Sequence, residues 1–249
     1  MMKSILYHKA TFYSLVICFL SLLLSQCSNP ITKPKEGFVY MEDKTFKLNG
    51  KDFYPMILNY GTELMMGNNM LWAKPSNTGY EDRNAKYTKE AARLKLKADL
   101  QMIKDLGFNT VRLYGIAEYK IKDNVISKFA DIGRDTIFTV EGENLEKYLT
   151  ALTDVFKILD EVGLKAIVLT KKIPDENAVA DTHLSTLLTR FKDEKAILAW
   201  DFFNEPLYFD VPNRKKEEVY QIVKDWKKFS RRYAPNQLLT IGLTGVRFR

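Results

Sequence analysis

Short runs of consecutive apolar residues alternate along the chain with segments in which apolar residues recur every three or four positions. The short runs predict strands that are buried on both faces, and they cover residues 56–60, 109–115, 165–170, 197–203 and 238–244. The periodic segments predict amphipathic helices over residues 96–106, 145–159, 184–191 and 219–229. Such an alternation indicates a parallel sheet with helices packed against it.

A small β-hairpin is predicted ahead of this unit. Residues 38–54 contain short strand-like runs, and the dipeptide Asn49-Gly50 between two of them is typical of a tight turn. Polar stretches over residues 74–89 and 116–143 predict a surface loop and an insertion. Both a (β/α)8 barrel and an open doubly wound sheet fit this order of elements. No glycine-rich phosphate-binding loop follows a predicted strand, which disfavours a nucleotide-binding sheet.

The first thirty residues have the pattern of an export signal. Two lysines precede an apolar run at 12–24 that is too short to span a bilayer but suits a signal peptide. The tetrapeptide at 24–27 resembles a bacterial lipobox, in which cleavage precedes a lipidated cysteine; the alternative is an ordinary signal peptide with a chance cysteine. We predict a signal peptide over 1–26, and then a lipidated Cys27 with a tether over 27–37. The expected location is the bacterial cell envelope, in the periplasm or at the cell surface, with the membrane as a partner through the lipid.

Composition narrows the classes of function. The 249 residues are 46% hydrophobic and 28% charged, which is typical of a folded domain large enough to bury a core. The formal charge of +7 arises from 38 basic and 31 acidic residues spread along the chain, so no nucleic-acid partner is expected. Only two histidines and two cysteines occur, which leaves no cluster for a zinc or iron–sulfur site. We therefore expect neither a metal nor a cofactor.

The candidate chemistry lies at the end of the fourth predicted strand. Asn204-Glu205-Pro206 directly follows the apolar run, so a carboxylate emerges where barrel enzymes assemble their active sites. The alternative is that Glu205 is a surface residue at the start of a loop. Arg112 stands inside the second apolar strand and needs an acidic partner, which could be an active-site carboxylate or a structural ion pair with Asp201.

Three segments together are similar to one enzyme family. They are the hairpin at 46–54, the strand at 111–114 and the run at 197–206, Ile-Leu-Ala-Trp-Asp-Phe-Phe-Asn-Glu-Pro. They resemble the retaining glycoside hydrolases of the (β/α)8 clan, most of all glycoside hydrolase family 5, which contains cellulases and β-mannanases. The resemblance implies an α/β fold, a (β/α)8 TIM barrel with an N-terminal β-hairpin. Its domain would span 38–249 and contain about strands 1–5.

The resemblance also implies roles for individual residues. Glu205 matches the acid/base that protonates the departing glycosidic oxygen and then activates water. Asn204 matches the residue that binds the sugar 2-hydroxyl, and Arg112 matches the arginine that orients the nucleophilic carboxylate.

Several aromatic residues follow predicted strand ends and offer flat faces to sugar rings. These candidate substrate-binding residues are Tyr60, Trp72, Tyr114 and Tyr208, although packing is the commoner use of such side chains. His183 precedes the third predicted helix, and we expect it to be a surface or capping residue.

The family takes its nucleophile, a second glutamate, from strand 7, whereas this sequence stops at Arg249 after the fifth predicted strand. Retaining hydrolysis needs two carboxyl groups about 5–5.5 Å apart. Glu63 and Glu118 follow the first two strands but match no nucleophile position. We therefore expect the N-terminal part of a longer enzyme that hydrolyses mannan or a β-glucan, inactive alone. The alternative is a truncated, non-catalytic carbohydrate-binding or structural protein.

Overall fold

A computed structural model describes most of the chain from Lys35 onward, which forms one compact unit. The described residues are 35–67, 69–76, 87–117, 120–122, 125–127, 142–174, 178–204 and 215–242. The predicted signal peptide, Cys27, Glu118, Glu205, Tyr208 and the predicted nucleophile region therefore lie outside them. No helix among the described residues is long and apolar enough to cross a membrane.

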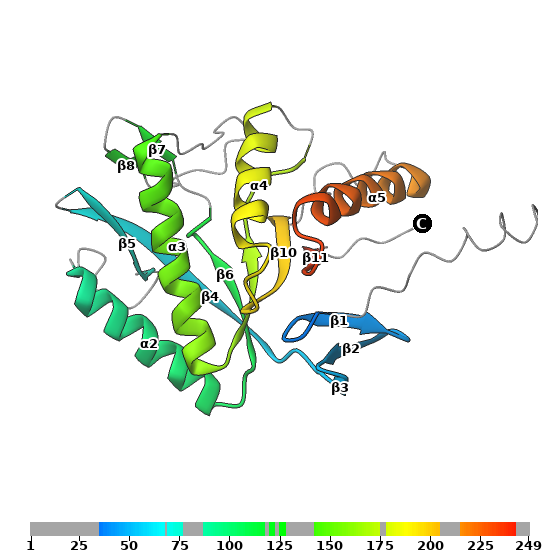
Figure 1. Ribbon diagram of the computed structural model, residues 1–249, viewed down its shortest axis with the longest axis horizontal. Helices are drawn as coiled ribbons and strands as arrows, with labels where there is room; N and C mark the ends of the chain where they lie inside the picture. Colours follow the sequence, from blue (N-terminus) through cyan, green and yellow to red (C-terminus); the bar gives the residue numbers. More distant parts are fainter. Residues whose placement is uncertain are drawn as a thin grey trace, which may run out of the picture. The chain divides into compact units, whose positions relative to one another are not determined.

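A six-stranded sheet forms the centre of this unit (Figure 1), with strand order β11-β10-β9-β6-β4-β5. Five strands are mutually parallel and follow the chain order without reversal: β4 (Ile57–Gly67), β6 (Thr110–Tyr114), β9 (Lys165–Leu169), β10 (Ile197–Asn204) and β11 (Leu238–Gly242). All five correspond to predicted strands. The described strands do not close on themselves, so they form an open sheet.

The first of these strands is longer than predicted. Instead of ending at Gly61, β4 continues to Gly67 and turns into β5 (Met70–Pro75), which runs antiparallel beside it. The reason lies in core packing: Leu64 continues the face of β4 that carries Leu58 and Tyr60, and it enters the main core together with Leu71 and Ala73 of β5. The start of the predicted polar loop is therefore part of the sheet.

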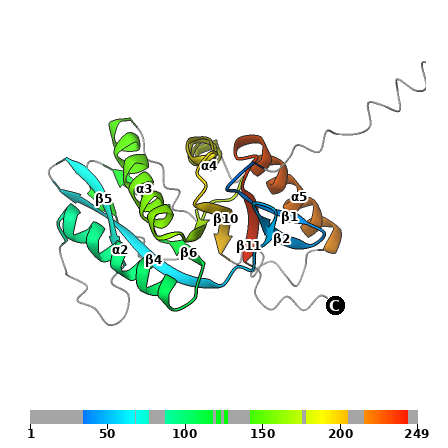
Figure 2. The ribbon, with the colours of Figure 1, turned by 60° about the horizontal axis from the view of Figure 1, so that its bottom comes forward.

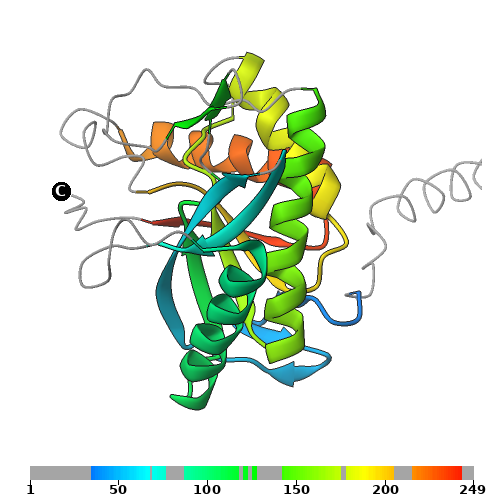
Figure 3. The same cartoon turned by 90° about the vertical axis from the view of Figure 1, so that its left-hand side faces the viewer.

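Four helices are described, and all four contribute side chains to one hydrophobic core. They are α2 (Lys89–Asp105), α3 (Glu143–Val162), α4 (Ala178–Phe191) and α5 (Lys216–Tyr233). Figures 2 and 3 show them along the same side of the sheet. A doubly wound sheet carries helices on both faces, whereas a barrel carries them only outside. The two architectures left open by the sequence are thus decided in favour of the barrel type.

Helix ends follow the local chemistry of the chain. The hydroxyl of Thr88 accepts a hydrogen bond from the Ala91 N–H at the start of α2, which satisfies one of the free donors of the first turn. Gly163 ends α3 with φ of 77°, a left-handed conformation that glycine adopts without a Cβ penalty. The chain then enters β9 after a single further residue.

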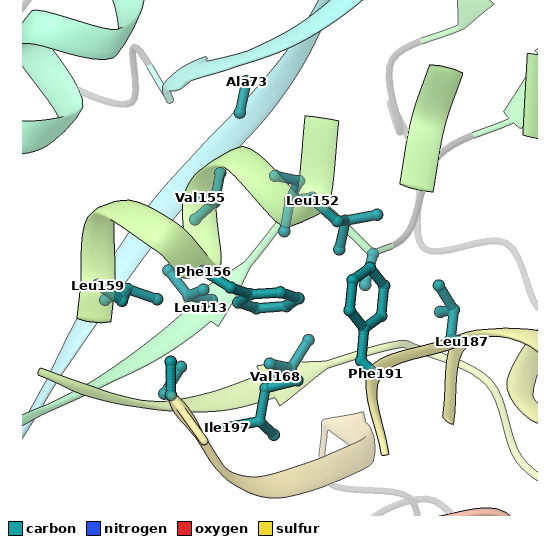
Figure 4. Close-up of a cluster of buried hydrophobic side chains, with 14 of the residues drawn as sticks. Ala73, Leu113, Leu152, Val155, Phe156, Leu159, Val168, Leu187, Phe191 and Ile197 are labelled. Carbon is teal, nitrogen blue, oxygen red and sulfur yellow. The ribbon is translucent and has the colours of Figure 1, made fainter. Parts of the chain in front are cut away.

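The main core lies between the sheet and the helices (Figure 4). Phe156 of α3 and Phe191 of α4 meet edge to face, with ring centroids 4.9 Å apart, above Leu113, Val168 and Ile197 of three adjacent strands. Full burial of such side chains is worth about 1.5–3 kcal/mol each. Because side chains alternate along a strand, anchoring these residues toward the helices turns their neighbours to the opposite face.

The predicted hairpin is present and covers part of that opposite face. It consists of β1 (Val39–Glu42), β2 (Thr45–Leu48) and β3 (Lys51–Asp52), with Asn49 and Gly50 at positive φ in the turn. Val39 packs in a second core with Ile167 of β9 and with Leu198 and Ala199 of β10. The amino-terminal half of the non-helical face is thus closed by apolar packing.

Polar contacts also hold the start of the domain against the strands. The Lys165 ammonium donates to the carbonyl oxygens of Gly37 and Lys195, and Lys35 pairs with Asp193. The last residues of the predicted tether, 35–37, therefore contact the folded body.

A further two-stranded hairpin, β7 (Lys120–Lys122) and β8 (Val125–Ser127), lies within the predicted insertion. Residues 128–141 of the predicted insertion lie outside the described residues.

His183 is buried, and its prediction as a surface residue was wrong. Only 5% of the residue is exposed, and its Nε2 lies 3.4 Å from the carbonyl oxygen of Ala117. On α4 it stands three residues after Ala180 and four before Leu187, so it shares their buried face. Burial, with a smaller contribution from the charge of Lys172, lowers the pKa of His183 to about 3.

This burial predicts a measurable acid sensitivity. An imidazole has a pKa near 6.5 in the unfolded chain and about 3 here, so only the unfolded state takes up its proton between those values. Its stabilising contribution is complete above pH 6.5 and is lost as pH falls toward 3, by up to about 1.4 kcal/mol per pH unit. His183→Gln is expected to flatten the decline in unfolding free energy over this interval, measured by urea titration. An unchanged slope would contradict a buried neutral imidazole.

Candidate active site

Beyond the second core, the non-helical face becomes polar toward the carboxyl ends of the parallel strands. Val111 and Leu113 of β6 face the helical core. Arg112 and Tyr114, which alternate with them along the strand, therefore lie on the non-helical face. From β10 the same region receives Asp201. Catalytic groups of barrel enzymes gather at this end of the strands.

Arg112 connects β6 to β10. Its Nε and Nη2 donate to Oδ2 of Asp201 at 2.9 and 2.7 Å, and Nη2 also donates to Oδ1 of Asn204 at 3.0 Å. The Asp201 side chain is 1% exposed and the Arg112 side chain 20%. The alternative interpretation of Arg112, an ion pair with Asp201, therefore describes a real contact, and the same guanidinium also touches a predicted site residue.

Asp201 and Asn204 reach one guanidinium because β10 is irregular. Residues three apart on a regular strand point to opposite faces. Here the pairing of β10 with β11 changes register between Asp201 and Asn204, which are paired with Thr240 and Gly242. This two-against-one irregularity turns Asn204 toward the face that Asp201 occupies. Such bulges are common beside active sites, where they redirect a side chain.

Two opposing effects act on the Asp201 carboxyl. Burial raises its pKa above the ordinary value, whereas the hydrogen bonds and charge of Arg112 and the backbone N–H of Phe203 lower it. Arg112 is thus the group that allows a carboxylate to remain charged at this depth.

Comparisons with known proteins concern the fold. No protein-family model and no curated protein sequence matches the chain. Solved structures do match: the endo-1,4-β-mannanase from Rhizomucor miehei has a TM-score of 0.54 at 17% identity, over 84% of this chain and 61% of that one. The β-1,4-D-mannanase from Cryptopygus antarcticus has a TM-score of 0.51 at 13% identity, over 83% and 61%.

A glycoside hydrolase family 5 mannosidase from Rhizomucor miehei, in complex with mannosyl-fructose, has a TM-score of 0.51 at 13% identity, over 86% and 57%. This chain shares the fold of these three structures. The chain spans about 57–61% of the length of these three structures. The partial barrel predicted from the sequence is therefore confirmed.

A second polar group lies further along the same face of the sheet. Glu63 of β4 stands opposite Lys74 of β5, with Oε2 2.9 Å from Nζ, and Ser76 donates to its Oε1 at 3.0 Å. Tyr114 lies against Gly61, where an added Cβ would sit 2.7 Å from the phenol oxygen. Sequence reasoning missed the buried Glu63–Lys74 pair, because Lys74 was placed in a polar loop.

Tyr60 is not part of the group around Arg112. Its ring packs with the core on the helical side, and its hydroxyl donates to Oδ2 of Asp99 on α2 at 2.9 Å. The residues on either side of Tyr60, Asn59 and Gly61, are the ones that lie on the Arg112 face.

Trp72 shares the face of Arg112 but lies far along it. Its pairing partner on β4, Met65, is six residues beyond Asn59, the partner of Arg112. At about 3.3 Å per residue this is roughly 20 Å, too far for both side chains to contact one sugar ring. The Trp72 ring lies against Gly67, where an added Cβ would be 2.7 Å from Cη2.

Among the predicted site residues that the structure describes, Arg112 and Asn204 are in contact, and Tyr114 lies on the same face of the sheet as Arg112. Glu205, the residue after Asn204, lies outside the described residues. Within the described ranges, no group of three or more His, Cys, Asp or Glu side chains is placed to hold a metal ion.

Proposed function

We propose that this chain is part of the catalytic domain of a retaining glycoside hydrolase that acts on a β-linked polysaccharide. The observation that supports this most is the contact between Arg112 and Asn204, directly before Glu205, at the carboxyl end of a family 5 sheet. An arginine and an amide held together at this position suit the binding of a sugar hydroxyl beside a reacting carboxylic acid.

The proposed reaction gives each residue one task. Glu205 donates a proton to the glycosidic oxygen as its bond to the anomeric carbon breaks, and a second carboxylate forms the covalent glycosyl intermediate. Glu205 then takes a proton from the water that releases the sugar. Asn204 binds the 2-hydroxyl, and Arg112 orients the second carboxylate, which we place in residues that follow Arg249 in the complete protein.

Mannan is the first substrate to test, with β-glucan as the comparison. Two of the structures that share the fold are named as β-mannanases, and the third is a mannosidase. The proposed surroundings are the cell envelope, reached by the signal peptide over 1–26 and retained through lipid on Cys27. This proposal rests on the pattern of the first thirty residues.

The proposal predicts that the complete protein hydrolyses a β-linked glycan and that the first product keeps the β configuration. Reducing ends released from mannan and β-glucan measure the hydrolysis, and NMR of the earliest anomeric products measures the stereochemistry. The 249-residue chain, assayed beside it, is expected to show no turnover, because retaining hydrolysis needs two carboxyl groups. Turnover by the 249-residue chain would contradict the placement of the nucleophile. Binding without hydrolysis by the complete protein would favour the non-catalytic alternative.

A further inference from the structure

We infer that Asp201 is a positioning residue, which acts through Arg112 to fix the orientation of the Asn204 amide. The inference rests on the proposed function and extends it to a residue that would not touch the substrate. It starts from the three hydrogen bonds that join these side chains across β6 and β10.

The bonds hold the guanidinium in one plane. Nε and Nη2 of Arg112 both donate to Oδ2 of Asp201, which fixes one edge of the fork. Nη2 carries two hydrogens, and it also donates to Oδ1 of Asn204. Asp201 is buried and belongs to a strand of the sheet, so it is the rigid end of this chain of contacts. The hydrogen bond from Arg112 therefore reaches Asn204 from one fixed direction.

Contact with Arg112 decides which end of the amide faces the ligand. A guanidinium has donors and no acceptor, so the group of Asn204 that faces it is the carbonyl oxygen. The Asn204 Nδ2 and its two hydrogens then point away from Arg112. A ligand at this position must present an acceptor, as the oxygen of a sugar hydroxyl does. Without a fixed guanidinium the amide could rotate and present its own acceptor.

A contribution to folding stability does not by itself explain why a buried aspartate stands at position 201. A buried ion pair is often replaceable by apolar side chains with little loss, because desolvation offsets the attraction between the charges. Apolar neighbours for such a replacement already exist, since the second core lies just below on β9 and β10. The Asp201–Arg112 pair is joined to Asn204 across a β-bulge, and its effect on the orientation of the Asn204 amide explains it better.

The test compares aryl β-glycosides that carry or lack the 2-hydroxyl, using the complete protein. Asp201→Ala is expected to lower kcat roughly 10- to 100-fold on the 2-hydroxy substrate, a size typical of lost positioning. The loss on the 2-deoxy substrate should be smaller, because it contains only the effect that passes through Arg112 to the second carboxylate. Asp201→Asn keeps a carbonyl oxygen for Arg112 and should be intermediate. Asn204→Ala should also lower the ratio of the two rates, and adding Asp201→Ala to it should lower that ratio no further.

Asp99→Asn is the matched control, because Asp99 also accepts bonds from two side chains, Tyr60 and Lys95, but on the helical side. In Asp99→Asn, the ratio of kcat on the two substrates should stay the same as in the original protein. An equal loss on both substrates in the Asp201 variants would overturn the inference and indicate a structural role. So would a ratio of the two rates that falls further in the double variant than in Asn204→Ala.

NMR of the 15N-labelled 249-residue chain tests the same inference without catalysis. In Asp201→Asn the Arg112 Nε–H and the Asn204 side-chain amide resonances should both shift, whereas in Asp99→Asn they should not. Unmoved Asn204 resonances would overturn the inference. If they shift but the complete protein hydrolyses no glycoside, the positioning geometry stands and the proposed function fails.

Discussion

Replacing Glu205 with alanine is expected to slow hydrolysis of mannan or β-glucan by the complete protein about 10²- to 10⁴-fold, the usual range for a lost general acid/base. Alkoxide leaving groups need a proton as the glycosidic bond breaks. An aryl glycoside with an acidic phenol leaves without one, so its first step should be much less affected. The measurement is kcat/KM on both kinds of substrate.

Glu217→Ala is the control, since Glu217 is an exposed glutamate in the first turn of α5. It should leave both rates within about twofold of the original. An undiminished rate on the polysaccharide in Glu205→Ala would remove Glu205 from the mechanism. An equally large loss on glycan and aryl glycoside would show that its part is not proton donation.

Arg112→Met is expected to lower the free energy of unfolding by about 3 kcal/mol at neutral pH, because it leaves the buried Asp201 charge without its partner. Replacing both residues, as in Arg112→Met with Asp201→Leu, removes the unpaired charge and should cost less than Arg112→Met alone. Urea unfolding of the 249-residue chain measures both variants. Arg93→Met, which breaks an exposed contact with Glu161, should cost less than 1 kcal/mol.

The loss in Arg112→Met should also depend on pH in a defined direction. Burial already raises the pKa of Asp201, and removal of the arginine raises it further. Folding then favours the protonated carboxyl, so the penalty is absent below the unfolded pKa of about 3.9 and grows as pH rises through the folded pKa. The difference in stability from the original chain should be larger at pH 8 than at pH 4. A difference that is constant or largest at pH 4 would contradict this account of the pair.

The strands and helices could be predicted because their signals are local and strong. Residues 166–169 of β9 are apolar at successive positions, and Gly163 marks the preceding helix end. The sequence could not show that all helices share one side of the sheet, because that depends on contacts between distant segments. The extension of β4 was missed for a related reason: its alternation continues past Gly61, and glycine was taken as a stop.

The sequence could predict which residues form the candidate site better than it could predict how their side chains are arranged. Placing Arg112 and Asn204 near one edge followed from their positions in strands. Of the two alternatives for Arg112, the structure shows the ion pair with Asp201, and its contact with a nucleophilic carboxylate stays a prediction. No sequence pattern indicates the register change that turns Asn204 toward Asp201. The face on which an aromatic residue lies depends on strand phase, which is why Tyr60 was grouped with Tyr114 although it faces the helices.

The N-terminal hairpin has a consequence for the order in which the domain is made. Its partners come late in the chain: Gly37 is held by Lys165, 128 residues later, and Lys35 by Asp193, 158 residues later. At ribosomal speeds this delay is on the order of ten seconds. An isolated hairpin is at best marginally stable, so the apolar side of Val39 stays unprotected over that time. A chaperone that binds nascent chains has its longest opportunity at this segment, which is synthesised before the strands on which it packs.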